Sequence, residues 1–269
     1  MRYMVTGTKG WIGKMVAYAI QDTYPTIKLE GFDSGTCDYQ EWNEKWQHFM
    51  WEYCNCRHDS YKPPRMIIHI GGVSDSNAGN EMCFESNFLP TVDIVDYCKR
   101  DGSLLLYFSS SSAINPTTPY GYSKYSAEQY IRKVMKPENV CILQPFNIWG
   151  PGEGSKTSPS IIHQIKNDTL PIIFNDCVRD FVYISDVVLA VLSLVIRFQP
   201  GTFQLGTGCP THITEIPKML DMSWERYADT ADFDGYEKRR VADKEKILPD
   251  WHPTPVDKYL KHKNYKRWI

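Results

Sequence analysis

The feature that most constrains the fold of this chain is a glycine-rich turn near its N-terminus. Gly7, Gly10 and Gly13 recur at intervals of three residues. They follow the short apolar run Tyr3–Val5 and precede a segment with apolar residues at helical spacing. Glycines at such a junction let the backbone turn tightly and approach a pyrophosphate, while free amides at the start of a helix attract the anion. The pattern predicts a β-strand, a turn that binds a dinucleotide and an α-helix.

An acidic residue after the next apolar run supports this interpretation. Asp33 lies 20 residues after Gly13 and directly after Ile27–Phe32. A carboxylate at this place accepts hydrogen bonds from the ribose hydroxyls of the adenosine half and repels a 2′-phosphate. Asp33 therefore favours NAD, and NADP stays open because Lys9 lies in the glycine turn.

A tyrosine and a lysine four residues apart predict a proton-transfer site. Tyr120 and Lys124 would lie one above the other on a helix, so the ammonium can sit near the phenol and favour the phenolate. Tyr122 is only two residues from the lysine and points to another face. The predicted strand Leu104–Ser109 leads into the run Ser109–Ser112 and brings its hydroxyls to the carboxyl edge of a parallel sheet, where ligands bind.

In this order, these elements resemble the extended short-chain dehydrogenase/reductase family, in particular its nucleotide-sugar epimerase, dehydratase and reductase branch. Further segments extend the resemblance over nearly the whole chain: Ile67–Gly72, Asn87, Phe108–Ala113, Gln144–Pro151, Arg179–Val187 and Arg240–Asp243. The resemblance implies an α/β fold, with a Rossmann-type doubly wound parallel sheet and a smaller, interleaved C-terminal substrate lobe. We expect residues 1–155 to form the NAD(P)-binding domain. Residues 156–269 should form mainly the substrate-binding lobe, with segments near 180–206 returning to the first domain.

The resemblance also assigns roles to individual residues. Tyr120 would be the acid/base, Lys124 would support it and hold the cofactor ribose, and Ser111 would donate a hydrogen bond to the reacting oxygen. Ser110 stays an alternative, because nothing in the serine run fixes its register. The residues expected to bind the cofactor are Gly7, Lys9, Gly10, Trp11, Ile12, Gly13, Asp33, Ile70, Gly71, Gly72, Asn87, Ser109, Tyr120 and Lys124. Those expected to bind the substrate are Ser110, Ser111, Asn147, Arg179 and Arg240, the arginines through the diphosphate.

Two departures from the family pattern concern segment length. Only nine positions separate Ser111 from Tyr120, where most family members have twenty or more. The stretch between Asp33 and Ile67 is also short, and we interpret Cys37–Tyr39 as the remnant of the usual third strand. Both changes trim the predicted site without removing its hydroxyl, phenol or ammonium.

The residues after the serine reduce the number of reactions that are candidates for this chain. Ser112 and Ala113 stand where the 4,6-dehydratases of the family carry an acidic pair, and no glutamate of the decarboxylating members is evident. An NAD-dependent nucleotide-sugar epimerase, acting at a sugar carbon such as C4, is therefore the leading interpretation. An NAD(P)H-dependent keto-sugar reductase is the alternative. A non-catalytic dinucleotide-binding sensor or assembly protein is the alternative of another class.

Composition excludes other classes of partner. The net charge of −2 and a pI near 6.4 give no basic field for nucleic acid or anionic lipid. No apolar stretch reaches the roughly 20 residues that span a bilayer, and no signal peptide is evident, so we expect a cytoplasmic protein without a membrane partner. The eight cysteines are scattered, and no metal site is expected. By resemblance we expect a homodimer, with apolar contacts from Tyr125, Tyr130, Ile131 and Val134.

Overall fold

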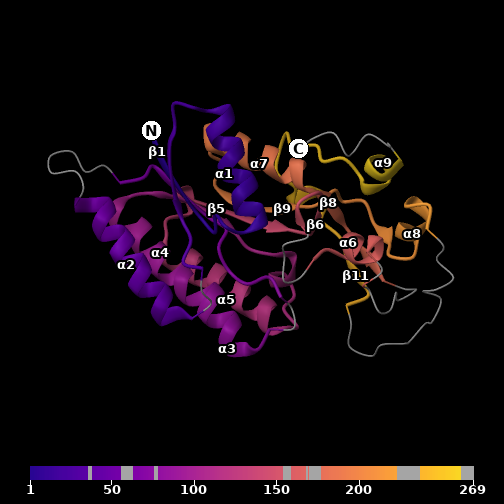
Figure 1. Ribbon diagram of the computed structural model, residues 1–269, viewed down its shortest axis with the longest axis horizontal. Coiled ribbons are helices and arrows are strands. Elements are labelled where there is room, and N and C mark those ends of the chain that lie inside the picture. The colour runs from indigo at the N-terminus through magenta and orange to yellow at the C-terminus, as the bar shows by residue number, and fades with distance from the viewer. Residues whose placement is uncertain are drawn as a thin grey trace. The chain divides into compact units, whose positions relative to one another are not determined.

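The chain forms two compact units, shown in the computed structural model of Figure 1. Unit 1 comprises Met1–Gln144 and Val191–Thr202, and unit 2 comprises Pro145–Ala190 and Phe203–Ile269. The chain therefore leaves unit 1, returns to it within helix α7 (Ile184–Ile196) and leaves it again. The structure describes residues 1–35, 38–55, 63–75, 78–153, 159–167, 169, 177–222 and 237–261.

A six-stranded sheet of order β2-β1-β3-β4-β5-β9 forms the centre of the fold. Its first five strands pair in parallel, and the order reverses between β1 and β3, so the predicted doubly wound parallel sheet is confirmed. Strands β1, β3 and β4 are almost continuously buried, as expected for strands covered on both faces. The strands are β1 (Arg2–Thr6), β2 (Lys28–Phe32), β3 (Met66–His69), β4 (Leu104–Phe108), β5 (Val140–Pro145) and β9 (Gly201–Leu205).

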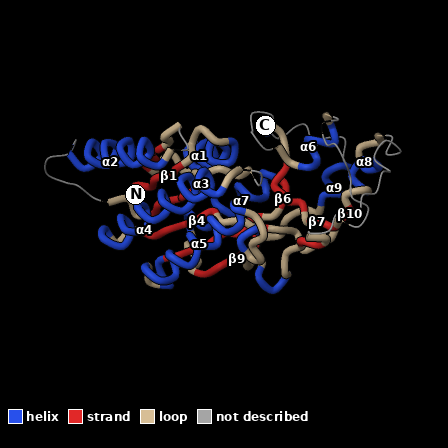
Figure 2. The backbone as a smooth tube through the Cα atoms, turned by 90° about the horizontal axis from the view of Figure 1, so that it is seen from below, coloured by secondary structure: helices blue, strands red, loops and turns tan. Residues whose placement is uncertain are grey.

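Helices cover both faces of the sheet in unit 1. Helix α1 lies on one side, and α2, α4 and α5 lie on the other, where they share one hydrophobic core (Figure 1). Figure 2 shows the same helices and strands of unit 1 from below. The helical segments of unit 1 are α1 (Trp11–Thr23), α2 (Tyr39–Asn55), α3 (Asn80–Cys83), the π-helix η1 (Phe84–Phe88), α4 (Leu89–Asp101), the 3₁₀ turns η2 (Ser111–Ala113) and η3 (Pro137–Asn139), and α5 (Pro119–Val134).

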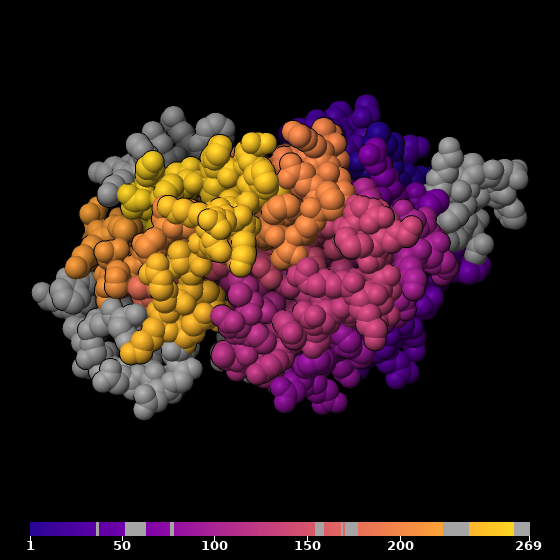
Figure 3. Space-filling view, turned by 180° about the vertical axis from the view of Figure 1, so that it is seen from behind, coloured from indigo at the N-terminus to yellow at the C-terminus, as the bar shows by residue number. Residues whose placement is uncertain are grey.

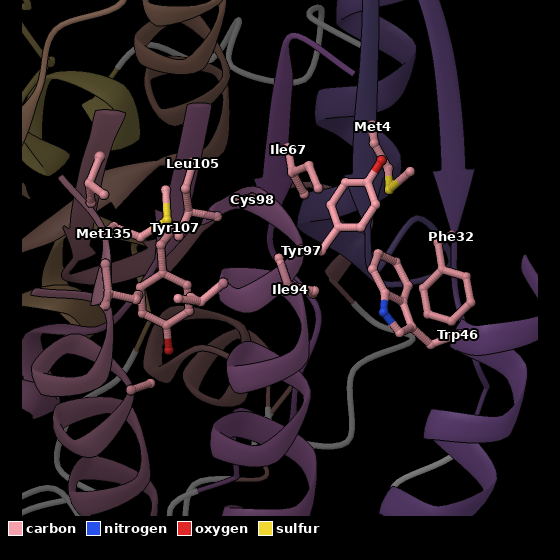
Figure 4. Packing of buried hydrophobic residues seen from close by; sticks show 14 of the residues in the cluster. Met4, Phe32, Trp46, Ile67, Ile94, Tyr97, Cys98, Leu105, Tyr107 and Met135 are labelled. Carbon is pink, nitrogen blue, oxygen red and sulfur yellow. The ribbon is translucent and has the colours of Figure 1, made fainter. Parts of the chain in front are cut away.

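Aromatic side chains anchor α2 to this core. The Trp46 ring lies between Phe32 of β2 and Tyr97 of α4, with ring centroids 5.1 and 6.2 Å away (Figure 4). Edge-to-face contacts of this kind add to the free energy gained by burying the rings. The interpretation of residues 37–39 as a strand remnant is wrong for Tyr39, because this residue starts α2 and its ring stacks on that of Trp42. Cys37 lies outside the described residues.

Helix α5 also corrects one expectation about a dimer contact. Ile131 is fully buried in the core of unit 1, and Tyr130 and Val134 pack against that core. Ile131 therefore packs within the monomer rather than against a second copy. Tyr125 is exposed.

Unit 2 combines two small sheets with short helices around an aromatic core. The parallel pair β6 (Asn147–Trp149) and β8 (Phe181–Tyr183) contributes Trp149 and Tyr183, whose ring centroids are 4.8 Å apart. A second sheet has the order β10-β7-β11. Its strands and the remaining helical elements are β7 (Val178–Arg179), β10 (Thr211–His212), β11 (Arg239–Arg240), α6 (Ile161–Lys166), α8 (Glu215–Met219), the 3₁₀ turn η6 (Lys244–Lys246) and α9 (Val256–Lys261).

Asp186, in the first turn of α7, binds the last described segment of unit 2. Its carboxylate accepts hydrogen bonds from the Thr254 amide and the Tyr259 hydroxyl, and its backbone carbonyl accepts one from the Trp251 indole, all at 2.8–2.9 Å. The residues of this segment appear in yellow on the surface of unit 2 (Figure 3). None of the described helices is both long and apolar enough to cross a membrane.

Candidate active site

The glycine turn after β1 has no space for a side chain at two of its glycines. Gly7 has a φ of +76°, and a Cβ on it would lie 2.7 Å from the Gly71 Cα. A Cβ on Gly13 would lie 2.0 Å from the Gly7 carbonyl oxygen. Gly10 closes the turn by donating its amide to that oxygen at 3.0 Å, and α1 begins at the next residue, Trp11. The turn thus leads directly into a helix N-terminus, an arrangement that suits a pyrophosphate.

Asp33 follows β2, beside this turn. Its carboxylate accepts the backbone amides of Lys9 at 2.8 Å and Gly35 at 2.9 Å. The acidic group is therefore tied to the glycine turn and held at the carboxyl end of the sheet. Ile12 is half-buried in the first turn of α1.

Helix α5 begins at the residues that carry the predicted chemistry. The Thr118 hydroxyl caps the helix by accepting the Gly121 amide at 3.1 Å, and Pro119 occupies its first turn. The side chain of Lys124 is turned inward and only 4% exposed, whereas Tyr122 is 50% exposed, as its spacing predicts. Tyr120 is half-buried.

The Lys124 ammonium lies against the end of β4. It donates to the Phe108 carbonyl at 3.1 Å and lies 5.2 Å from the centre of the Tyr107 ring. Burial lowers the pKa of Lys124 from 10.5 to about 8, and the charge of Glu128 opposes this shift. The amine is therefore cationic near neutral pH but close to its titration range.

The three buried serines after β4 have different partners. Ser109 donates its hydroxyl to Glu128 at 2.5 Å, and the Ser110 hydroxyl accepts the Ser112 amide at 3.1 Å. Ser111 is also buried, but its hydroxyl makes no hydrogen bond to the described part of the chain. The hydroxyls of Ser110 and Ser111 therefore both keep a hydrogen that can be donated to a ligand.

A chain of hydrogen bonds through His69 connects the loop of Gly71 and Gly72, which follows β3, to the π-helix η1. The Gly71 amide donates to the Thr6 hydroxyl at 3.3 Å, and that oxygen lies 2.7 Å from His69 Nδ1. His69 Nε2 lies 3.0 Å from the hydroxyl of Thr91, which donates to the Asn87 carbonyl at 2.6 Å. Because the Thr91 hydrogen is used for that carbonyl, His69 must donate from Nε2 and accept at Nδ1. His69 is therefore a neutral, structural imidazole.

The Asn87 side chain extends this chain to α5. Its Nδ2 donates to the Ser123 hydroxyl at 3.0 Å, and that hydroxyl donates to the Tyr120 carbonyl at 2.8 Å. These donors fix the orientation of the amide, so Asn87 Oδ1 is directed toward Gly72, where an added Cβ would lie 2.2 Å away. This buried oxygen has no partner among the described residues, and a ligand donor would satisfy it. Ile70 connects β3 to the same glycine pair.

His69 gives the protein a testable pH dependence. Burial, with a further effect of the Lys124 ammonium, lowers the pKa of His69 from 6.5 to about 3. As the pH falls below 6.5, the unfolded chain gains a proton on this imidazole and the folded chain does not, so stability decreases. The expected loss due to His69 between pH 7 and pH 5 is roughly 2 kcal/mol. Urea unfolding at both pH values should show that His69→Gln removes this part of the loss, and an equal loss in both proteins would contradict the assignment.

In unit 2, the structure places the two predicted arginines on neighbouring strands. Arg179 of β7 and Arg240 of β11 are Cα partners in parallel register, so their side chains lie on the same face of the small sheet. Arg179 is 5% exposed and donates to the carbonyls of Val178 and Lys238, while Arg240 forms an ion pair with Glu237.

Asp180 and Asn147 organise the same region of unit 2. Asn147 donates its side-chain amide to the Asp180 carbonyl at 2.7 Å. The fully buried Asp180 carboxylate accepts the amides of Thr207, Gly208 and Ala242, together with the Thr207 hydroxyl. Asn147 thus has a structural partner.

Sequence reasoning missed Glu128 and the hydrogen-bonding roles of Thr6, Thr91 and Ser123. A signal for Glu128 was available, because it continues the four-residue spacing of Tyr120 and Lys124. The other three are common polar residues, each with a partner on another element.

The fold and the residues at the carboxyl edge of β4 define a dinucleotide-binding α/β enzyme class with a tyrosine-lysine pair. Residues 3–206 match the model of the NAD dependent epimerase/dehydratase family. Since the match spans most of the chain, this protein belongs to that family of NAD-dependent enzymes.

Solved structures show the same fold. UDP-glucose 4-epimerase from Thermus thermophilus, in complex with NAD, is 17% identical with a TM-score of 0.74, and the match covers 100% of both chains. dTDP-glucose 4,6-dehydratase from Bacillus anthracis, in complex with NAD, is 18% identical with a TM-score of 0.71, covering 97% of this chain and 94% of that one. dTDP-4-dehydrorhamnose reductase from Bacillus anthracis, in complex with NADP, is 14% identical with a TM-score of 0.70, covering 97% and 96%.

Proposed function

We propose that this protein is an NAD-dependent nucleotide-sugar epimerase that removes and returns a hydride at one sugar carbon, C4 by resemblance. The observation that carries the proposal is the site on β4 and α5. It combines an available Ser111 hydroxyl, Tyr120 and a buried Lys124, with Ser112 and Ala113 where a dehydratase carries acids. Relatives of the same fold include an epimerase, a dehydratase and a reductase, so the fold alone does not select the reaction.

The residues of unit 1 fit a dinucleotide. The turn at Gly7 and Gly13 has no space for side chains, and α1 offers its free amides directly after it. Asp33 would accept the adenosine ribose, and the unsatisfied Asn87 Oδ1 would accept a donor at the other end. NAD, when bound, supplies the acceptor and later the donor of the hydride.

The side chains around β4 supply the proton chemistry. Tyr120 as phenolate takes the proton of the sugar hydroxyl while the hydride leaves the same carbon, which becomes a carbonyl. After the sugar has rotated to present the other face of this carbonyl, Tyr120 returns the proton. The Lys124 ammonium stabilises the phenolate, and Ser111 donates a hydrogen bond to the reacting oxygen as charge develops there. Arg179 and Arg240 would bind the diphosphate of the nucleotide. The proposal includes a homodimer through α4 and α5, where Tyr125 is exposed.

The experiment is a panel of UDP-, dTDP- and GDP-sugars incubated with the protein and NAD. An epimerase yields the epimer without an external reductant, and the purified protein retains its cofactor. A keto-sugar reductase consumes reduced cofactor that exchanges freely. This alternative remains because the cation of Lys9, in the glycine turn, is compatible with NADPH. Tight NAD binding without turnover or hydride transfer on any sugar would instead identify a non-catalytic dinucleotide-binding protein.

Asp33 should set the preference for NAD. Asp33→Ser removes a carboxylate that would bind the ribose hydroxyls and repel a 2′-phosphate, so NAD affinity should fall about 10-fold while NADP affinity does not fall. Isothermal titration calorimetry measures both constants. Asp22→Ser is the matched control, because it removes an exposed carboxylate from α1. An equal loss of affinity for NAD and NADP would show that Asp33 only stabilises the glycine turn and does not select the cofactor.

A further inference from the structure

A buried carboxylate lies one helical turn beyond Lys124. Glu128 is 3% exposed. Its Oε1 accepts the Ser109 hydroxyl at 2.5 Å and the Gln144 amide at 2.9 Å, and its Oε2 accepts the Arg132 guanidinium at 2.9 Å. These partners come from the residue after β4, from β5 and from α5 itself. One side chain therefore ties the ends of two central strands to the helix that carries Tyr120.

The partners of Glu128 are all donors, so both of its oxygens act as acceptors. A carboxylate is the form that accepts at both oxygens, and the Arg132 cation supports its charge. Arg132 itself is about half-exposed and also donates to the Thr202 hydroxyl at 2.8 Å. The negative charge is thus held inside unit 1, and its countercharge lies at the surface.

The charge of Glu128 acts on Lys124, its neighbour at four residues' spacing. Among the described residues, Glu128 is the group that raises the pKa of Lys124 against the effect of burial. The groups of β3 and β4 near the ammonium carry no negative charge: the neutral His69, the Tyr107 ring and the Phe108 carbonyl. Tyr120, one turn before Lys124 on α5, carries a negative charge only as the phenolate of the proposed reaction. Removal of this charge would leave the effect of burial unopposed, so the pKa of Lys124 would fall further.

We propose that Glu128 is a positioning residue: its buried negative charge, one helical turn from Lys124, supports the ammonium, and its hydrogen bonds hold the Ser109 and Gln144 ends of β4 and β5 against α5. The effect on turnover rests on the proposed function, because it requires that Lys124 supports the reaction. The charge of Lys124 can be measured without any substrate, so the two proposals can fail separately.

The test is Glu128→Gln, which keeps the size of the side chain and removes its charge. In a ¹³C-lysine NMR titration, with the Lys124 signal assigned by its absence in Lys124→Met, the pKa of Lys124 should fall by about 1 unit from its wild-type value. The alkaline limb of the kcat/KM profile should move down by the same amount. At pH 7.5 this corresponds to a roughly 3-fold loss of kcat/KM.

Two further variants separate charge from packing. Glu128→Asp keeps the charge and should leave the Lys124 titration within a few tenths of a unit of wild type. Arg132→Gln removes the countercharge and leaves the carboxylate, so the pKa of Lys124 should stay or rise. A Lys124 titration unchanged in Glu128→Gln overturns the proposal. If that variant does not fold, a fall of the Lys124 pKa in Arg132→Gln overturns it instead. A protein without sugar turnover leaves the NMR result as the deciding measurement.

Discussion

Tyr120→Phe is expected to lower kcat by about 1000-fold and to leave NAD affinity within about 2-fold of wild type. The variant removes one hydroxyl and keeps the ring. The start of α5 should persist, because the Thr118 cap and Pro119 set it rather than the phenol. Single-turnover kinetics with the active sugar measures the chemical step, and calorimetry measures the cofactor affinity.

The matched control for this variant is two residues away. Tyr122→Phe removes the same atom from a side chain that is half-exposed on another face of α5, so its kcat should equal that of wild type. If Tyr120→Phe kept most of its activity, the proton would be transferred by another group, and the site proposed on α5 would be wrong.

Gly13→Ala is expected to weaken NAD binding by at least about 100-fold and to lower the thermal stability of unit 1. Alanine inside a helix is ordinarily favoured over glycine by about 1 kcal/mol. Here the added Cβ would lie 2.0 Å from the Gly7 carbonyl oxygen, so the turn must open before the methyl group fits. The displaced turn can no longer approach a pyrophosphate.

Two other glycines provide a graded comparison. A Cβ on Gly10 would lie 3.2 Å from the same oxygen, so Gly10→Ala should have an intermediate effect. Gly79, before α3, has nothing within 4 Å of an added Cβ, and Gly79→Ala should bind NAD as wild type does. Calorimetry and melting curves test this order. Equal NAD affinity of Gly13→Ala and Gly79→Ala would show that the turn does not hold the cofactor.

Much of unit 1 could be predicted because its signals are local. Tyr3–Val5 and Leu104–Ser109 are short apolar runs of the kind that parallel strands need when both faces are covered, and both form strands, the second ending one residue earlier at Phe108. The expected remnant of a third strand failed at Tyr39, because contacts with other aromatic residues of α2 favour a helix there. Such competition depends on what the segment packs against, which the local pattern does not contain.

The connections within the candidate site could not be predicted, because they join distant residues. His69 could be assigned to a buried strand, but its partners Thr6 and Thr91 lie 63 and 22 positions away. Which serine of the run points to the site likewise depends on Glu128 of α5, because its carboxylate accepts the Ser109 hydroxyl. A pattern of residue types shows that hydroxyls reach the sheet edge. It does not show which of these hydroxyls form hydrogen bonds within the protein.

The π-helix Phe84–Phe88 has a consequence for how this chain tolerates changes in length. A π-turn contains one residue more than a regular turn, so deleting one residue between α3 and α4 would yield a continuous and intrinsically more favourable α-helix. The same deletion would rotate Asn87 by about 100° relative to one flanking helix and break its bond to Ser123. The π-turn therefore gives up some regularity of the helix and keeps the direction of a single amide.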